Sequence, residues 1–503
     1  MPNACWFDVR AHGAKGDGKA PDTGPLQAAI GTCSAAGGGT VLVPAGTYLP
    51  GPIKLARHVT LCLEAGATLK ASERLEDYPM DAERWSGESP RAGLLTAEGA
   101  DNVAIVGRGT IDGSGVAFCD PARTKGASDL DASLTRQGAA FAQMLLNAPD
   151  GPYEHGERPG NLVRFRDCTD VLLSGVTICN SPTWTVQFCD CEGVRIEGVR
   201  IHSHGGDNRV PNDDGIDLRA CRRVRVTGCD IDTGDDCIAV FGSQELAVSD
   251  CTLRSRSSVI RVGYDVGETR DCAFSNVVIY DSNRGICVQV RGPGSVENVQ
   301  FSNMVIRTRL LAGQWWGNGE PIHVSTLHLR QDGGPLGGVR GVCFSDIIAE
   351  GESGILLHGC DAGEMRDISF DNVSLRMRRS DLHAARGGNF DLRGAPDPSC
   401  AVFRHDVPGL YARGVRDLAL RNFRLEWDDG LPAFFTHGLW IQHFRDLDIS
   451  GFVGGPNRGA ADAAAIALSD GDGADVTDGR PTPGTRTFLQ RDHVTRLVHH
   501  LGG

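Results

Sequence analysis

The chain has 503 residues, a formal net charge of −14 at pH 7, and 40% hydrophobic and 23% charged residues. These proportions are typical of a globular protein and exclude a disordered chain. The acidic balance argues against a nucleic-acid partner, because basic surfaces dominate affinity for nucleic acids. No stretch approaches the roughly 18 apolar residues that a membrane-spanning helix needs, so we expect no membrane partner.

The amino-terminal segment and the cysteines predict a cytoplasmic location. Residues 1–18 contain no basic stretch followed by an apolar one, so no signal peptide is visible. The 17 cysteines are odd in number and scattered, and several lie in strand-like runs. A reduced thiol in such a run behaves as a small core hydrophobe, which favours a reducing compartment over a disulfide framework.

A short helix is expected at residues 22–36, within a cap region at residues 1–70. In that helix, one face would carry Leu26, Ala29, Ile30 and Cys33. Such a face is suited to covering the open end of stacked strands, which would otherwise expose unpaired backbone groups.

One phrase recurs from about residue 100 onward: a short alternating run, a polar turn, and a further apolar pair. Its copies lie at residues 171–178, 194–201, 224–231, 246–253, 272–279, 299–306, 342–348, 368–375 and 418–425. The first six copies start 22 to 30 residues apart, and no helical stretch separates them. This period with two-residue alternation is typical of a β-solenoid. We therefore predict an all-β fold, a single-stranded right-handed parallel β-helix, as one domain at residues 1–450.

The longest gaps between copies predict long side loops at about 307–340 and 377–415, which in a solenoid usually wall one face. Residues 451–503 are rich in Gly, Ala and Asp and contain Pro-Thr-Pro. We expect an irregular tail there that packs on the β-helix, with a short helix near 486–500.

Three aspartates predict an acidic site on one sheet. Asp214 and Asp235 are 21 residues apart, close to one coil, and Asp236 follows directly. Residues one coil apart lie about 4.8 Å from each other in a stacked ladder. Mutual repulsion between crowded carboxylates raises the pKa of one of them and leaves another ionised. Paired acid and base catalysis requires such a difference. Glycosidic hydrolysis is the reaction most associated with such a pair.

Several motifs resemble glycoside hydrolase family 28, the polygalacturonase family of pectin-degrading β-helix enzymes, over roughly residues 7–350. Two of them are amino-terminal segments, at residues 7–18 and 38–48. The other three are Ser181-Pro-Thr-Trp184, Asn212-Asp-Asp-Gly-Ile-Asp217 and Gly234-Asp-Asp-Cys-Ile-Ala239. The last three occur in order and at family-like spacing. The resemblance implies Asp235 as general acid, Asp214 with Asp236 as the pair that activates water, and Asn212 as the residue that orients them. It also implies inversion at the anomeric carbon.

The chain departs from the family at two cationic motifs. The Gly-His-Gly motif should fall near Ser257–Val259, where no histidine stands. The Arg-Ile-Lys motif should fall at Cys287–Gln289, where both cations are missing. A galacturonate carboxylate bound there would be unpaired, which is costly in a partly dry site. We therefore expect either a sugar other than the usual galacturonate at the cleavage site, or a galacturonate that is bound in a different way. Arg261 and Arg291 are the candidates for compensating cations.

The first side loop carries further candidates for substrate binding. Trp315 and Trp316 could stack on sugar rings, and Glu320 and His323 could bond sugar hydroxyls; the tryptophans could instead pack the loop onto the β-helix. No spacing in the sequence is that of a metal site or a phosphate loop, so we expect neither a metal nor a cofactor.

The sequence thus favours an inverting glycoside hydrolase that cuts an oligosaccharide or polysaccharide substrate, with the long loops favouring an exo-acting pocket. Two alternatives remain on the same fold. A polysaccharide lyase or epimerase would need calcium ligands and a basic residue, and a non-catalytic glycan-binding β-helix would show no turnover.

Overall fold

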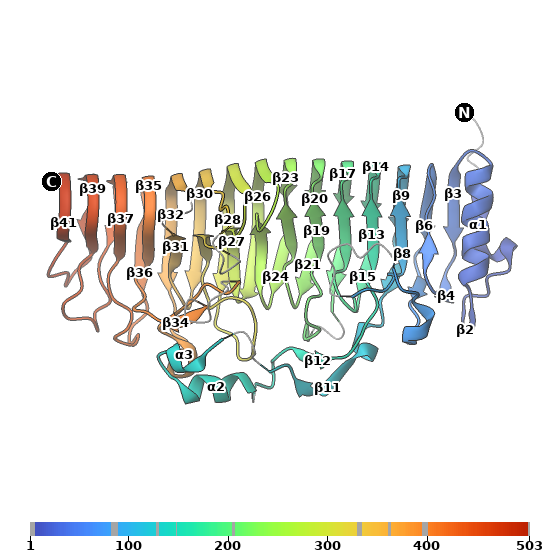
Figure 1. Ribbon diagram of the computed structural model, residues 1–503, viewed down its shortest axis with the longest axis horizontal. Coiled ribbons are helices and arrows are strands. Elements are labelled where there is room, and N and C mark those ends of the chain that lie inside the picture. Colours follow the sequence, from blue (N-terminus) through green and yellow to red (C-terminus); the bar gives the residue numbers. More distant parts are fainter. Residues whose placement is uncertain are drawn as a thin grey trace. The chain divides into compact units, whose positions relative to one another are not determined.

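The computed structural model describes residues 6–81, 89–126, 130–146, 148–203, 207–328, 334–360, 364–394 and 401–500. The chain divides into two compact units. Unit 1 comprises residues 1–125 and 152–253, and unit 2 comprises residues 126–151 and 254–503. Both are built almost entirely from parallel strands, labelled in Figure 1. The fold is the predicted right-handed parallel β-helix. The prediction that residues 1–450 form one domain stays a prediction.

Unit 1 opens with a short strand, followed by a 3₁₀ helix, a second strand and an α-helix, and continues mainly as short strands; 3₁₀ helices are labelled η. Its elements are β1 (Trp6–Asp8), η1 (Val9–His12), β2 (Asp17–Pro21), α1 (Thr23–Ala35), β3 (Gly39–Val43), β4 (Gly46–Leu49), β5 (Ile53–Lys54), β6 (Val59–Leu63), β7 (Ala67–Lys70), η2 (Leu75–Asp77), β8 (Leu95–Glu98), β9 (Asp101–Gly107), β10 (Thr110–Asp112), η3 (Gly115–Phe118), β11 (Cys119–Thr124), β12 (Tyr153–His155), β13 (Val163–Arg166), β14 (Thr169–Ser174), β15 (Thr177–Cys179), β16 (Val186–Cys189), β17 (Glu192–Glu197), β18 (Arg200–His202), β19 (Ile216–Arg219), β20 (Arg222–Thr227), β21 (Asp230–Thr233), β22 (Ile238–Phe241), β23 (Gln244–Ser249) and the start of β24 (Thr252–Ser255).

Each coil of unit 1 contributes one strand to each of three parallel ladders. One ladder runs through β8, β13, β16, β19 and β22. The second runs through β9, β14, β17, β20 and β23, and the third through β7, β10, β15, β18 and β21. Because each strand pairs in register with its equivalents one coil before and after, residues one coil apart stack directly. Apolar stacks such as that of Phe165 on Phe188, with centroids 5.0 Å apart, fill the interior.

The predicted capping helix is confirmed. Helix α1 spans Thr23–Ala35, and its buried residues are Leu26, Ala29, Ile30 and Cys33, the four that were expected to share a face. This face contacts strands β1 and β3. The helix therefore covers apolar side chains of the first coils that would otherwise face water.

Unit 2 contains longer strands and two short helices in the part described. Its elements are η4 (Ala132–Leu134), α2 (Ala139–Leu146), the end of β24, β25 (Ser258–Val262), β26 (Glu268–Ser282), β27 (Arg284–Val290), β28 (Ser295–Thr308), β29 (Ile322–Thr326), β30 (Val339–Gly351), β31 (Ile355–Gly359), β32 (Met365–Met377), α3 (His383–Arg386), β33 (Asn389–Asp391), β34 (Val402–Arg404), β35 (Leu410–Arg421), β36 (Arg424–Trp427), β37 (Leu439–Ser450), β38 (Val453–Gly454), β39 (Ile466–Thr477), β40 (Arg480–Pro481) and β41 (Leu489–His500).

The recurring phrase of the sequence has a physical basis in unit 2. Its aromatic position forms a buried column in which neighbouring rings stack with centroids 4.7 to 5.2 Å apart: Phe274, Phe301, Phe344 and Phe370. Two residues later the backbone turns through φ of +52° to +55°, at Asn276, Asn303, Asp346 and Asn372. Asn and Asp tolerate this left-handed conformation better than other residues with a side chain. The phrase therefore specifies a phenylalanine ring that faces the interior, followed by a left-handed turn of the backbone.

The two predicted side loops contain local structure. The first includes β29, and the second includes α3 and the antiparallel pair β33 and β34. A third insertion, between β10 and β13, was not expected from the repeat. Its helix α2 packs against α3 in unit 2, as Figure 1 shows, and buries Phe141 and Leu145 with Val402.

The prediction of an irregular tail at residues 451–503 is wrong. Strands β38 to β41 continue the parallel ladder, and β41 lies where a short helix was expected. In β39, Ile466, Leu468, Ala474 and Val476 are buried at alternating positions on either side of a glycine-containing corner. Small residues therefore suffice for an inward face, and the Gly- and Ala-rich composition concealed the alternation. No helix in the described residues is long and apolar enough to cross a membrane.

We predict that Phe301→Ala lowers the free energy of unfolding by about 3–5 kcal/mol, because it opens a cavity within the aromatic column. The matched control is Val305→Thr on the same strand, where the side chain is 47% exposed and a change within about 0.5 kcal/mol is expected. Denaturant titration followed by circular dichroism measures both. Equal losses in the two variants would contradict the packing role of the column.

Candidate active site

The three predicted catalytic aspartates of unit 1 meet at one place. Asp214 lies on the turn before β19, and Asp235 and Asp236 lie on the turn before β22. The backbone ladder continues through these turns, because the Gly215 N–H donates to the Asp236 carbonyl at 2.8 Å. One carboxylate oxygen from each aspartate lies within 4.8 Å of the others, and all three side chains are buried. The three carboxylates therefore crowd one patch as expected, but the register places Asp214 opposite Asp236 and not opposite Asp235, the residue 21 positions later.

Glycines allow the two turns to approach this closely. A Cβ atom at Gly215 would lie 2.5 Å from the carbonyl oxygen of Cys237 on the next coil. A Cβ atom at Gly234 would lie 2.7 Å from Oδ1 of Asp213. Since real Cβ atoms essentially never come so close, any larger residue would push the turns, and hence the carboxylates, apart.

Asp213 is a site residue that sequence reasoning missed. Its Oδ1 accepts hydrogen bonds from the backbone N–H groups of Gly234 at 2.7 Å and Asp235 at 3.2 Å, and its Oδ2 accepts one from the Ser203 hydroxyl. The side chain therefore ties the turn of Asp214 to the turn of Asp235. Burial raises the pKa of Asp213 to about 7, although these hydrogen bonds oppose the rise.

Asn212 is held from a distant part of unit 1. Its backbone has φ of +58°, and its Oδ1 accepts a hydrogen bond from Nη2 of Arg158 at 2.9 Å. Nη1 of Arg158 donates to the Pro211 carbonyl at 2.6 Å, and the arginine is only 1% exposed. Arg158 thus fixes the segment that leads into Asp213 and Asp214. A partner 54 residues away has no local signal in the sequence.

Unit 2 contains the predicted residues of the first side loop, and two of them are engaged with the protein itself. Glu320 accepts from Arg284 at 3.2 Å and from the Asn318 N–H at 2.6 Å. His323 is fully buried, with Nε2 2.7 Å from the Ser325 hydroxyl. Burial opposes ionisation of Glu320, but Arg284 lowers its pKa to about 2, while burial and Arg284 lower the pKa of His323 to about 3. Their predicted contacts with sugar hydroxyls stay predictions.

The tryptophans differ in environment. Trp315 is 2% exposed, its Nε1 donates to the Asp150 carbonyl at 2.9 Å, and Arg256 lies over its ring. This environment favours the packing alternative for Trp315. Trp316 is half-buried, with the guanidinium carbon of Arg393 4.9 Å from its ring centroid.

Hydrogen bonds made by buried charged side chains join the two side loops of unit 2. Arg393 donates to both oxygens of Asp391, and Asp391 also accepts from the Gly317 N–H at 2.9 Å. Arg386 donates to Asn318 at 2.8 Å and to the backbone carbonyls of Leu311, Gly313, Trp315 and Gly317. Sequence reasoning missed these groups, since their pairing depends on loops about 70 residues apart in the chain.

The predicted compensating cations lie in unit 2. Arg261 is half-buried on β25, with its guanidinium carbon 5.6 Å from the ring centroid of Tyr264. Arg291 follows β27 and is 1% exposed. Cys287 and Gln289, which stand where the resembled family has cations, are both buried on β27.

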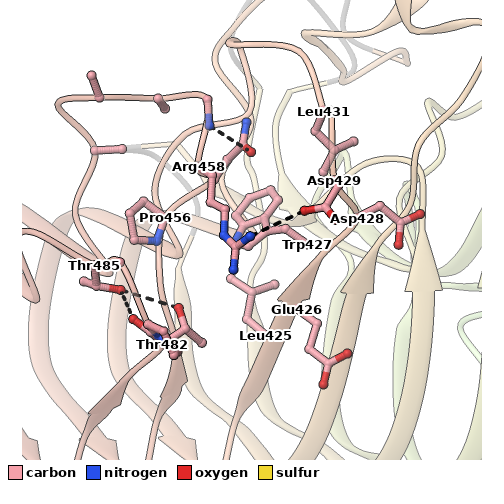
Figure 2. Close-up of a pocket in the computed structure, with 18 of the residues that line it drawn as sticks. Leu425, Glu426, Trp427, Asp428, Asp429, Leu431, Pro456, Arg458, Thr482 and Thr485 are labelled. Atoms are coloured by element: carbon pink, nitrogen blue, oxygen red, sulfur yellow. Dashed lines mark hydrogen bonds and ion pairs between the residues drawn. The ribbon is translucent and has the colours of Figure 1, made fainter.

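A separate cavity of about 800 Å³ lies among the last coils of unit 2. Figure 2 shows residues that line it, including Trp427, Arg458 and Thr485, with Arg458 paired to Asp429 at 3.6 Å. None of the residues predicted for catalysis or substrate binding lines this cavity. It is therefore not the predicted site.

Comparisons with known proteins agree with these motifs. Residues 33–310 match the family described as glycosyl hydrolases family 28. A probable polygalacturonase of Vitis vinifera is 28% identical over 407 residues, which cover 74% of this chain and 76% of the relative. The structure of a family 28 exopolygalacturonase of Yersinia enterocolitica has a TM-score of 0.64 at 20% identity, covering 88% of this chain and 78% of that one. A hyperthermoactive exopolygalacturonase from Thermotoga maritima has a TM-score of 0.59 at 26% identity, covering 75% and 88%.

We predict that Asp213 makes stability fall as the pH rises from about 4 to about 7. Across this range the folded chain keeps a proton on Asp213 that the unfolded chain, with a pKa near 3.8, has released. Asp213→Asn keeps an acceptor for the Gly234 and Asp235 N–H groups but cannot ionise. Its free energy of unfolding, measured by urea titration, should vary less between pH 4 and 7 and exceed that of the wild type at pH 7. Parallel pH profiles would refute this assignment.

Proposed function

The chain belongs to glycosyl hydrolases family 28, whose match spans more than half of it, and is a glycoside hydrolase; we propose that it cuts pectic oligosaccharides from a chain end, with inversion. The observation that carries the proposal is the group of three buried carboxylates, Asp214, Asp235 and Asp236, with oxygens within 4.8 Å of each other.

The proposed reaction is a single displacement by water. Asp235 donates its proton to the glycosidic oxygen, and the bond from that oxygen to the anomeric carbon breaks. A water molecule attacks the anomeric carbon and passes a proton to the pair formed by Asp214 and Asp236. Mutual repulsion of the crowded carboxylates supports the arrangement, because it favours one protonated member beside ionised ones. Asp213 acts as a positioning residue, since it holds the backbone of Asp235.

Inversion is proposed from the family resemblance. Inverting glycosidases usually separate their two carboxyl groups by roughly 6.5–9.5 Å to leave room for water, and retaining enzymes by about 5–5.5 Å. The oxygens here lie within 4.8 Å of one another. We therefore place the water beside Asp214 and Asp236 together, not in a wide gap between acid and base.

The sugar at the cleavage site is proposed to differ from the galacturonate of ordinary polygalacturonate. Cys287 and Gln289 occupy the positions of the family's two carboxylate-holding cations, and both are buried without charge. A carboxylate bound against these two residues would lose its hydration without gaining an ion pair from either of them, which disfavours it. A neutral sugar, such as rhamnose in a mixed pectic chain, does not incur this cost.

Exo action is supported by the covered sheet of unit 2. On strands β27 and β29, alternation places Gln289, His323 and Ser325 on the face opposite the apolar interior, yet their exposures are only 2%, 0% and 0%. The loops joined by Arg284, Arg386 and Asp391 cover this face. Loops over a sheet face obstruct the middle of a sugar chain more than its end. Both solved relatives described above are named exopolygalacturonases.

We predict that Asp235→Asn lowers kcat by roughly 10³-fold, because the amide cannot protonate the leaving oxygen. Reducing-sugar release from a panel of acidic and neutral pectic oligosaccharides measures kcat, and proton NMR of the first product reads its anomer. The matched control is Asp230→Asn, a 55%-exposed residue on the preceding strand β21, which should keep wild-type rates. A variant of Asp235 with more than a tenth of wild-type activity, or a retained anomer, would overturn the mechanism.

Three clustered carboxylates are also a possible calcium site, as the lyase alternative requires. If the aspartates act as acid and base, exhaustive treatment with EDTA should change the hydrolysis rate by less than twofold. No product absorbing in the ultraviolet should form. Loss of activity that added Ca²⁺ restores would instead assign the cluster to a metal.

A further inference from the structure

Arg291 is an unusual buried arginine. It is 1% exposed, and none of its three guanidinium nitrogens has a hydrogen-bond partner among the described residues. The other arginines buried in unit 2 are engaged: Arg284 with Glu320, Arg393 with Asp391, and Arg386 with several carbonyls. Arg291 therefore differs from these arginines, because all three of its guanidinium nitrogens are without a partner among the described residues.

Among the described residues, the side chains that act most strongly on Arg291 include no carboxylate. The groups that act most on it are Tyr264, Cys287, Arg284 and Arg261, and burial lowers its pKa to about 10. Moving a guanidinium out of water without a partner anion or hydrogen-bond acceptors destabilises the folded protein. The arrangement favours an anionic ligand that can occupy the planar donor fork.

The sheet of unit 2 places two further basic groups beside Arg291. Gln289, Ser325, His358 and Arg413 are successive rungs of one in-register ladder, so their side chains share a face at about 4.8 Å per rung. Arg291 lies directly after β27, two residues beyond Gln289. Burial, then Arg413 and Arg291, lowers the pKa of His358 to about 4, so each arginine is close enough to act on this histidine.

Two of the three basic residues are partly exposed to solvent, and a glycine lies against the third. His358 and Arg413 are only half-buried, and Nδ1 of His358 has no hydrogen-bond partner in the part of the chain described. Gly394 has φ of +87°, and a Cβ atom there would contact Nε of Arg291 and the Tyr264 hydroxyl at 3.4 Å. A residue with a side chain at this position would both be strained and fill the space against the guanidinium.

From this geometry we infer that Arg291, His358 and Arg413 form an anion-binding site that takes the carboxylate of an acidic sugar. The site lies in unit 2, and Gln289, one of the two positions of the missing family cations, is a rung of the ladder that carries His358 and Arg413. The anion site itself follows from unit 2 alone, and only the identity of its ligand as a saccharide rests on the proposed function. A uronate held here, with a neutral sugar at the cleavage site, describes a mixed acidic and neutral oligosaccharide.

Binding without turnover tests this site. Isothermal titration calorimetry measures the Kd of D-galacturonate, with D-galactose as its uncharged counterpart and sulfate as a free oxyanion. Galacturonate should bind the wild type, galactose at least tenfold more weakly, and Arg291→Met and Arg413→Gln should each weaken galacturonate tenfold or more, since charge-assisted hydrogen bonds are lost. Arg421→Gln is the control: it lies on the same strand as Arg413, is 48% exposed and pairs with Asp448.

Thermal unfolding distinguishes a ligand site from a structural arginine. Arg291→Met should raise the Tm of the ligand-free protein, because it removes an uncompensated buried charge, and should abolish the Tm rise that galacturonate causes. A lower ligand-free Tm with an unchanged galacturonate shift would overturn the proposal. So would equal binding of galacturonate and sulfate, which would indicate a site for small oxyanions. Loss of hydrolysis in Asp235→Asn tests the proposed function independently of these outcomes.

Discussion

The ladder of backbone hydrogen bonds through β16, β19 and β22 is the constraint on which the cluster of three aspartates depends. In-register parallel pairing repeats each position one coil later, so it forces the turns of Asp214 and Asp236 onto adjacent rungs. Like charges in such a stack are unfavourable, and the fold tolerates them because the ladder and the two glycine turns fix the backbone. The same force that holds the solenoid together therefore creates the carboxylate cluster.

Around this cluster, polar side chains keep the geometry fixed. Asp213 links two coils by accepting backbone N–H groups, and Arg158 anchors the segment before it. In unit 2, buried hydrogen bonds made by the charged side chains of Arg284, Arg386 and Asp391 hold the side loops over a sheet face that would otherwise be open. Buried charges of this kind are costly to break singly, which favours one loop arrangement over others. Arg291 contrasts with them, because its guanidinium nitrogens have no hydrogen-bond partner among the described residues.

Much of the fold could be predicted from the sequence, because each coil of a solenoid repeats the same short pattern of residues. The period, the Phe and Asn/Asp positions, and the apolar face of α1 are all readable within one coil. The convergence of Asp214, Asp235 and Asp236 followed from their spacing and the ladder. The tail was misjudged because Ala and Gly replaced the larger apolar residues on the inward face of β39. Arg158 and the loop pairs of unit 2 could not be predicted, since their partners are 36 to 107 residues away in sequence and only the folded loops bring them together.

The central claim is that this glycoside hydrolase keeps the carboxylates of its family but not the cations that hold a galacturonate at the cleavage site. The most direct test is kcat/KM of the wild-type enzyme for oligogalacturonate and for rhamnose-containing pectic oligosaccharides of equal length, measured side by side. The account predicts a clear preference for the rhamnose-containing substrates. Equal or faster cleavage of oligogalacturonate would contradict it and would indicate an ordinary polygalacturonase with differently placed cations.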